Sequence, residues 1–509
     1  MNLKKSDAKM MKRKQVKVNV LALSMIAILS IGCSKDDDVQ PQAGTPGETP
    51  TAEVNKVPEI SAQAFTVAED IADDIVVGKI AATDPESKAL TFTLTKNSDA
   101  LFELTDTGEL SLVANKKLDF ETVTSHTLTV EVSDGTHKAS AAITITVENV
   151  VEAFITTWKT TTANEEIVIG INTDFTYDFT IDWGDGTVEN NQNTLPSHTY
   201  VTPNTYTVKV SGKFPSISIN SGKDAHKLQT IEQWGDIVWE VLDSAFGSCE
   251  NMTYNATDVP NLSKVTSMEY MFVSATSFNG DLSNWDVSNV TNMEAMFSHA
   301  TSFTGDLSSW DVSKVTNMDY MFNDATSFNG DLSTWDVSKV TNMAYMFSIA
   351  RSFNSDLSNW DVSNVTNMKN MFANTNSFNS DLSSWNVSKV TNMYAMFSRA
   401  GSFNSDLSNW DVSKVTNMYA MFWNATSFTG NLSNWDVSKV TNMEAMLTNT
   451  KISIANYDAL LTKWAALPNL QSNVTFGVEG LVYCDAYAAR STLINDKNWT
   501  LTGDSSCPR

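Results

Sequence analysis

The chain has 509 residues, too many for one ordinary domain, so three or four folded units are expected. Its formal net charge of −25 argues against nucleic acid as a partner, because phosphate binding requires a basic surface. Only four residues are cysteines, which excludes a disulfide-rich scaffold and a cysteine-rich zinc module.

Residues 1–33 have the pattern of an export signal. A basic segment that includes Lys12–Lys14 precedes an apolar run from Val18 to Ile31, which has the length of a signal peptide. The run ends at SIGC, and a small residue followed by Cys33 resembles a bacterial lipoprotein signal. This resemblance implies lipidation of Cys33. A transmembrane anchor or a cleaved secretory signal, with Cys33 incidental, is the alternative.

The sequence SKDDD after Cys33 resembles the acidic export signal of surface-exposed lipoproteins in Bacteroidetes-type bacteria. The resemblance implies an outer-membrane lipoprotein that is exposed at the cell surface and held to the membrane by its N-terminal lipid. Residues 34–56 are rich in Pro, Gly, Thr and acidic residues and have no apolar period, which predicts a disordered tether.

Residues 57–152 contain six or seven short alternating segments separated by turn residues, which predicts a β-sandwich. Acidic residues fall at the ends of these segments, in AED, ATDPE, LDFE and VSDG. The arrangement resembles a cadherin repeat, a family in which such positions ligate Ca²⁺ between successive repeats. The resemblance implies these candidate calcium ligands: Glu69, Asp84, Glu86, Asp119, Glu121 and Asp134. The alternative is that the carboxylates cap turns, and no cofactor is required.

Residues 153–225 carry WGDG at Trp183–Gly186, HTY at His198–Tyr200 and then YTVKV. This pattern resembles a PKD-type immunoglobulin-like sandwich, in which the Asp-Gly pair makes a tight turn and the aromatic residues fill the core. We interpret His198 as structural, since no nucleophile or second base lies near it in the sequence.

Residues 226–450 repeat a unit of 25 residues that hardly changes from copy to copy. A fixed period of this length is the signature of a solenoid. Within a unit, VTNM is expected to form a short strand, and MEAMF about two helical turns that place Met, Met and Phe on one face. The predicted fold is therefore multidomain: two all-β immunoglobulin-like sandwiches followed by an α/β leucine-rich-repeat-like solenoid of 25-residue coils.

Three columns of the repeat could carry chemistry. One column is aromatic: Trp285, Trp310, Trp335, Trp360, Trp385, Trp410 and Trp435. We interpret it as core, because each Trp alternates with Leu and Val, and a sugar-binding stripe is the alternative. Two columns are acidic, one from Asp281 to Asp406 and one from Asp286 to Asp436. We interpret these as turn-capping residues paired with lysines, with Ca²⁺ bridging as the alternative.

The motif NMxxMFxxAxSFxxDLSxWDVSxVTNM resembles the BspA-type leucine-rich-repeat surface proteins over residues 230–505. That family is associated with adhesion and surface recognition, and the resemblance implies no enzymatic activity. An enzyme would require clustered acids outside the repeat pattern, and the conspicuous acids here belong to a column or a sandwich loop, so we expect the protein not to be an enzyme. We expect a monomer that binds a protein or cell-surface ligand. A glycan-binding accessory lipoprotein that captures polysaccharide is the alternative.

The binding determinants are expected where the repeats vary, above all at the two positions before each Met-Phe pair. The candidates are Glu294, Asp319, Lys369, Tyr394 and Trp423. Trp423 replaces the small residue that usually follows this pair, so it is expected to be exposed.

Residues 451–509 break the period and are expected to cap the solenoid. YDALLTKWAAL and YCDAYAARSTLIND have amphipathic patterns that predict two helices. Cys484 and Cys507 lie in this cap and are expected to pair in an exported protein, which leaves Cys249 as a buried thiol.

Overall fold

The computed structural model describes residues 54–508, apart from 98–99, 121 and 220–221. Cys33, the predicted signal and most of the predicted tether lie outside the described residues, as does Glu121. Within the described part of the chain, every helix is too short or too polar to cross a membrane.

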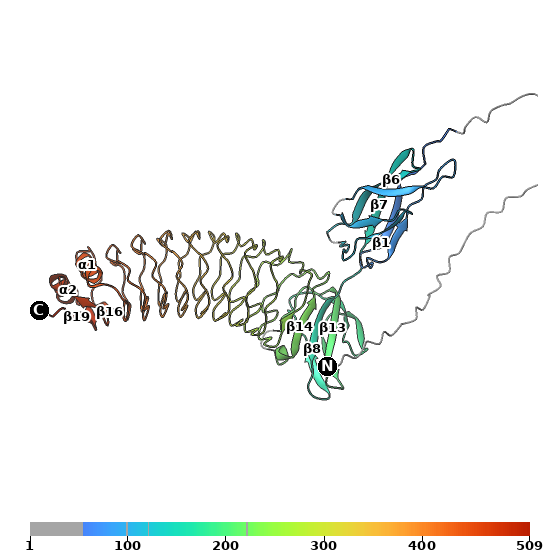
Figure 1. Cartoon of the computed structure of the whole chain (residues 1–509). Coiled ribbons are helices and arrows are strands. Elements are labelled where there is room, and N and C mark those ends of the chain that lie inside the picture. The colour runs from blue at the N-terminus through green and yellow to red at the C-terminus, as the bar shows by residue number, and fades with distance from the viewer. Residues whose placement is uncertain (1–53, 98–99, 121, 220–221, 509) are drawn as a thin grey trace, which may run out of the picture. The chain divides into compact units, whose positions relative to one another are not determined.

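The chain divides into two compact units. Of the described residues, one unit contains those up to Phe65 with Asp74–Ala114 and Thr127–Thr144. The other contains Thr66–Asp73, Asn115–His126 and those from Ile145 onward. Each unit is rich in β-structure (Figure 1).

Two sheets account for the strands before residue 150. The first has the order β1 (Gln63–Ala68), β7 (Lys138–Glu148), β6 (Ser125–Ser133) and β3 (Thr91–Lys96). The second has the order β2 (Val76–Lys79), β5 (Glu109–Leu112) and β4 (Phe102–Leu104). Alternate residues of β6, such as Leu128, Val130 and Val132, are fully buried, which is the pattern expected of a strand with one face on a core.

The next sheet joins the second predicted sandwich to the repeats. Its strand order is β11 (Val188–Gln192), β10 (Asp178–Asp182), β13 (Thr205–Lys213), β8 (Phe154–Lys159), β14 (Leu228–Gln233) and β15 (Thr253–Tyr254). A separate pair is formed by β12 (Ser197–Tyr200) and β9 (Glu165–Val168). The last two strands, β14 and β15, come after residue 225 and so belong to the predicted repeat region. One hydrophobic core continues from Phe154 through the repeats to Trp499.

The repeats stack as coils that hydrogen-bond to their neighbours through the main chain (Figure 1). In one coil the N–H groups of Met343, Tyr345 and Phe347 donate to carbonyl groups of the next coil at 3.1, 2.7 and 2.9 Å. Isolated parallel bridges join the asparagines of successive coils, from Asn292 to Asn442. Side chains form ladders inside the stack: Phe347 lies 5.6 Å from Phe322 and 5.7 Å from Phe372 between ring centroids.

The predicted helical turns of the repeat are wrong, and with them the α/β class. The described residues of the repeats contain turns and isolated bridges, and the α-helices of the described chain lie after them. Two residues of a typical coil, Tyr345 (φ 56°) and Ile349 (φ 63°), have left-handed backbone conformations that interrupt any α-helix. The N–H groups of Tyr345, Phe347 and Ile349 therefore bond to the next coil. Those of Met346, Ser348 and Ala350 bond to carbonyls three residues back, as in turns, and not four residues back, as in an α-helix. The protein is nearly all β.

The end of the chain contains both predicted helices, α1 (Ile454–Ala465) and α2 (Tyr487–Asn495). Two short parallel pairs accompany them: β16 (Thr475–Gly477) with β18 (Thr500–Thr502), and β17 (Val482–Tyr483) with β19 (Ser505–Ser506). The Leu447 N–H donates to the carbonyl of Gly477 at 2.9 Å, so β16 takes the place of a further coil.

Candidate functional site

The two columns of aspartates hold turns together. In each, a carboxylate oxygen accepts a hydrogen bond from the backbone N–H of the Ser two residues later, for example Asp306 from Ser308 at 2.9 Å and Asp311 from Ser313 at 3.0 Å. The Ser308 backbone N–H and hydroxyl lower the pKa of Asp306. Asn386 accepts the same bond in place of an aspartate, at 3.1 Å. These acids are therefore used within their own coils, and an amide can replace them.

The tryptophan column belongs to the core. Its members are between 1% and 4% exposed. The Nε1–H of Trp385 donates to the carbonyl of Leu357 in the preceding coil at 3.0 Å, and the same bond recurs along the stack. The indole rings are thus covered by neighbouring coils and present no face to a sugar.

Trp423 is not the freely exposed ring that the sequence predicted. It is half-buried, and the guanidinium carbon of Arg399 lies 4.4 Å from the centroid of its ring. This distance is typical of a cation–π contact. One face of the candidate binding residue is therefore already covered from within the chain.

The other four predicted binding residues occupy one column of the stack, at the first position after the Asn-Met pair, and all four are half-buried. Glu294 accepts hydrogen bonds from the Asn317 amide at 2.9 Å and from the hydroxyl of Tyr270, in the preceding coil, at 2.9 Å. Asp319 accepts one from the Asn342 amide at 3.0 Å. The column contains two further acids that sequence reasoning missed: Glu269, which the Asn292 amide contacts at 3.0 Å, and the exposed Glu444. We call Glu269, Glu294 and Asp319 the stripe acids.

Tyrosines continue this surface toward the C-terminus. The rings of Tyr320 and Tyr345 stack at 4.3 Å, and those of Tyr394 and Tyr419 stack at 4.8 Å. Between the two pairs, the Nζ atom of Lys369 lies 5.3 Å from the ring centroid of Tyr345 and 5.2 Å from that of Tyr394. We call these four tyrosines the tyrosine row, and the row together with the stripe acids and Lys369 the stripe.

The pKa values of Glu269 and Asp319 shift in the opposite direction to that of Asp306. Burial, together with the charges of Glu294 and Asp243, raises the pKa of Glu269. Burial, opposed by the hydrogen bond from Asn342 and reinforced by Glu294, raises the pKa of Asp319. Like charges about 5 Å apart repel by about 1 kcal/mol in a water-like dielectric. No described basic residue forms an ion pair with a stripe acid.

Glu69 and Asp119, two of the candidate calcium ligands, bond to the main chain. Glu69 is buried and accepts hydrogen bonds from the N–H groups of Phe120 and Val150, both at 2.7 Å. Asp119 accepts one from the Thr122 N–H at 2.8 Å. Both therefore act as caps of loops.

Three more of these candidates, Asp84, Glu86 and Asp134, are linked through the segment before β1. Asp84 accepts a hydrogen bond from the Glu86 N–H at 2.9 Å, and Glu86 accepts one from the Lys56 N–H at 3.0 Å. The His137 N–H donates to Asp134 at 2.6 Å and holds the pKa of that carboxyl well below its usual range. Among the residues that the structure describes, no three His, Cys, Asp or Glu side chains are arranged to hold a metal ion.

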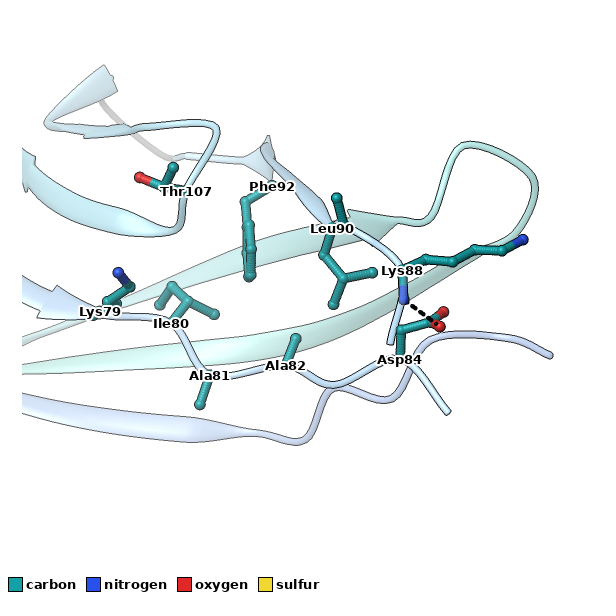
Figure 2. A pocket seen from close by; sticks show the side chains of 10 residues that line it. Lys79, Ile80, Ala81, Ala82, Asp84, Lys88, Leu90, Phe92 and Thr107 are labelled. Carbon is teal, nitrogen blue, oxygen red and sulfur yellow. Dashed lines mark hydrogen bonds between the residues drawn. The ribbon is translucent and has the colours of Figure 1, made fainter. Parts of the chain in front are cut away.

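A cavity of about 670 Å³ opens in the first unit (Figure 2). Its lining combines apolar side chains, among them Ile80, Leu90 and Phe92, with the flanking Lys79 and Lys88. It contains none of the sequence-predicted binding residues of the repeats.

His198 and the cap cysteines have structural partners. The Nε2 atom of His198 lies 2.8 Å from a carboxylate oxygen of Asp185, beside the WGDG turn, and its ring stacks on Trp183 at 5.2 Å. Cys484 and Cys507 form a disulfide with their Cα atoms 5.0 Å apart, and Cys249 is a free, buried thiol.

The repeats match a known family model. Residues 240–360 and 350–464 match the model described as "Mycoplasma protein of unknown function, DUF285". The repeats of this chain are therefore similar to those of that family. No curated protein matches the chain.

Solved structures similar to the chain include cadherins. The chain is 24% identical to human mucin-like protocadherin EC1-2, with a TM-score of 0.18, over 19% of this chain and 56% of that one. For Drosophila N-cadherin EC1-3 the identity is 23% and the TM-score 0.18, over 19% and 35%. For human protocadherin-24 EC1-2 they are 13% and 0.19, over 30% and 97%. The chain spans little more than half the length of the first of these structures.

Proposed function

We propose that the chain is a non-catalytic, BspA-type surface lipoprotein that binds a protein or cell-surface partner through its repeats. In this proposal Cys33 carries a lipid that anchors the chain to the outer membrane, and the repeats face outward. The observation that carries the proposal is that recurring and varying residues of the repeat occupy different places in the coil. The Val, Met, Phe, Leu and Trp residues that recur in the coils are buried and the recurring aspartates cap turns, whereas the positions of the stripe change from coil to coil.

The partly solvent-facing positions support recognition rather than catalysis. The stripe acids and tyrosines lie in consecutive coils of a hydrogen-bonded stack, which suits affinity spread over a wide rigid surface. His198, the residue that most suggests a general base, is paired with Asp185 and stacked on Trp183. Calcium in the first sandwich remains part of the proposal only as an accessory ion, since no activity depends on it.

Glycan capture is the less favoured proposal. Sugar binding by proteins relies on exposed aromatic faces, and the tryptophan column offers none. The tyrosines of the row stack in pairs, which covers one face of each ring, and Lys369 lies over the rings of Tyr345 and Tyr394. A glycan would have to bind through the polar edges of the stripe.

The proposal is tested with beads that carry the full chain. Adhesion is measured on immobilised matrix proteins, on cultured cells and on glycan arrays. We expect adhesion to at least one protein or cell surface, lost when that surface is treated with protease and retained after glycosidase treatment. Loss after glycosidase treatment alone would favour the glycan proposal, and no adhesion to any surface would contradict both.

A further inference from the structure

No ion pair among the described residues neutralises the stripe acids. Glu269, Glu294 and Asp319 lie in three successive coils, whereas the aspartates of the two turn-capping columns bond to backbone N–H groups of their own turns. The stripe acids are half-buried and receive hydrogen bonds from neutral side chains. A neutral donor does not neutralise a carboxylate, so the negative charge of these coils is available to a cationic partner.

The tyrosine row shows what kind of cation the surface accepts. Lys369 occupies the place of one ring in the row, and its ammonium group lies between Tyr345 and Tyr394. The face of a tyrosine ring attracts a cation that lies within about 6 Å of the ring centroid, through the negative charge of its π-system. The ammonium group of Lys369 is therefore already bound by cation–π contacts, and a cationic group of a partner would bind by the same type of contact.

The acids and the tyrosines share one face of the stack. Tyr270 donates to Glu294 of the next coil, and Tyr345 contacts Lys369 of the next coil in the same relative position. From Glu269 to Tyr419 the stripe crosses six coil steps, about 29 Å at 4.8 Å per step. About nine residues of an extended chain cover this length.

We propose that the stripe docks an extended segment of a partner protein that is rich in lysine and arginine. Its cationic side chains would pair with the stripe acids and lie against the tyrosine row. This inference rests on the proposed function and names the chemistry of its partner. A small metal ion does not fit, because it would need several carboxylates converging on one point, and the stripe acids are spread one to a coil.

The test compares two triple variants of the full chain that remove the same charge. The stripe-acid variant is Glu269→Gln, Glu294→Gln and Asp319→Asn. The turn-acid variant is Asp281→Asn, Asp306→Asn and Asp331→Asn, which copies the amide found naturally at Asn431 of that column. Both variants are titrated with fluorescent deca-lysine and deca-arginine at low and physiological salt, after their melting curves have been recorded.

We expect the stripe-acid variant to bind the cationic probes about tenfold more weakly and the turn-acid variant to bind within about twofold of the wild type. Equal losses in both variants would mean that only net charge matters and would overturn the inference. Binding of deca-glutamate or of a neutral oligosaccharide that depends on the stripe acids would overturn it as well.

A variant that is expected to bind more tightly provides a further test, because misfolding would weaken binding and not strengthen it. Lys369→Ala removes the internal ammonium group and opens the place between Tyr345 and Tyr394. We expect the cationic probes to bind this variant about threefold more tightly, since a competing positive charge is gone. Unchanged or weaker binding would refute the role of the tyrosine row. If the probes fail while the beads still adhere, the inference is wrong and the proposed function stands.

Discussion

The tryptophans offer a direct test of which residues of the repeat build the scaffold. Trp385 and Trp423 are both replaced by Ala, one at a time, in the full chain. Trp385 is 3% exposed, lies 6.4 Å from each of the stacked rings of Trp360 and Trp410, and donates a hydrogen bond to Leu357. Trp423 is half-buried.

The expected magnitudes differ clearly. Removing a buried Trp costs about 3–5 kcal/mol through lost burial and the cavity left behind. The carbonyl of Leu357 also loses its buried partner, which by itself costs about 1–3 kcal/mol where water cannot replace it. Trp423→Ala removes the buried part of one side chain and the contact with Arg399, which together should cost about 1–2 kcal/mol of stability.

Hydrogen exchange measured by mass spectrometry resolves the effect coil by coil, which matters because long repeat arrays need not unfold in two states. For Trp385→Ala we expect faster exchange in its own coil and in both neighbouring coils, with a lower melting temperature. For Trp423→Ala we expect a smaller, local change. Wild-type exchange around residue 385 in the Ala variant would refute the assignment of this column to the core.

Four further predictions concern the backbone, the charges and the anchor. Asn374 has a φ of 60°, so Asn374→Ala should lower stability by about 1 kcal/mol in thermal melts, whereas a helix would gain stability from Ala. The stripe-acid variant should melt higher than the wild type at pH 7, because the raised pKa of Glu269 and Asp319 marks charges that destabilise the fold, and the difference should vanish as the pH falls through those raised values. The turn-acid variant should melt lower at pH 7, because the lowered pKa values of its aspartates mark stability that is present above pH 3.8 and lost in stronger acid. Cys33→Ala should abolish incorporation of labelled fatty acid and release the chain from membranes, and continued labelling would contradict lipidation at this residue.

The residues of the coil that are buried could be predicted from the sequence, but the backbone conformation of the coil could not. Met343, Met346 and Phe347 have the spacing of one face of a helix, and all three are buried. The same spacing also fits a turn that bends twice through left-handed residues. The choice depends on hydrogen-bond partners 24 or more residues away, such as the carbonyl of Met371 for the N–H of Phe347, and no local pattern reports them.

The binding surface was found only in part for a related reason. Variation between copies was enough to single out Glu294, Asp319, Lys369 and Tyr394. The slot between Tyr345 and Tyr394 depends on the register between coils, because Tyr345 stands one position later in its unit. The partial cover of Trp423 by Arg399 likewise joins residues of different coils.

The central claim is that repeated residues build the scaffold and varying residues bind the partner. The measurement that tests it most directly is bead adhesion of the wild type, the stripe-acid variant and the turn-acid variant, side by side on the surface that the wild type binds best. The account predicts that the stripe-acid variant loses most adhesion while melting no lower than the wild type, and that the turn-acid variant keeps its adhesion. Adhesion that survives in the stripe-acid variant, or that is lost only in the turn-acid variant, would contradict it.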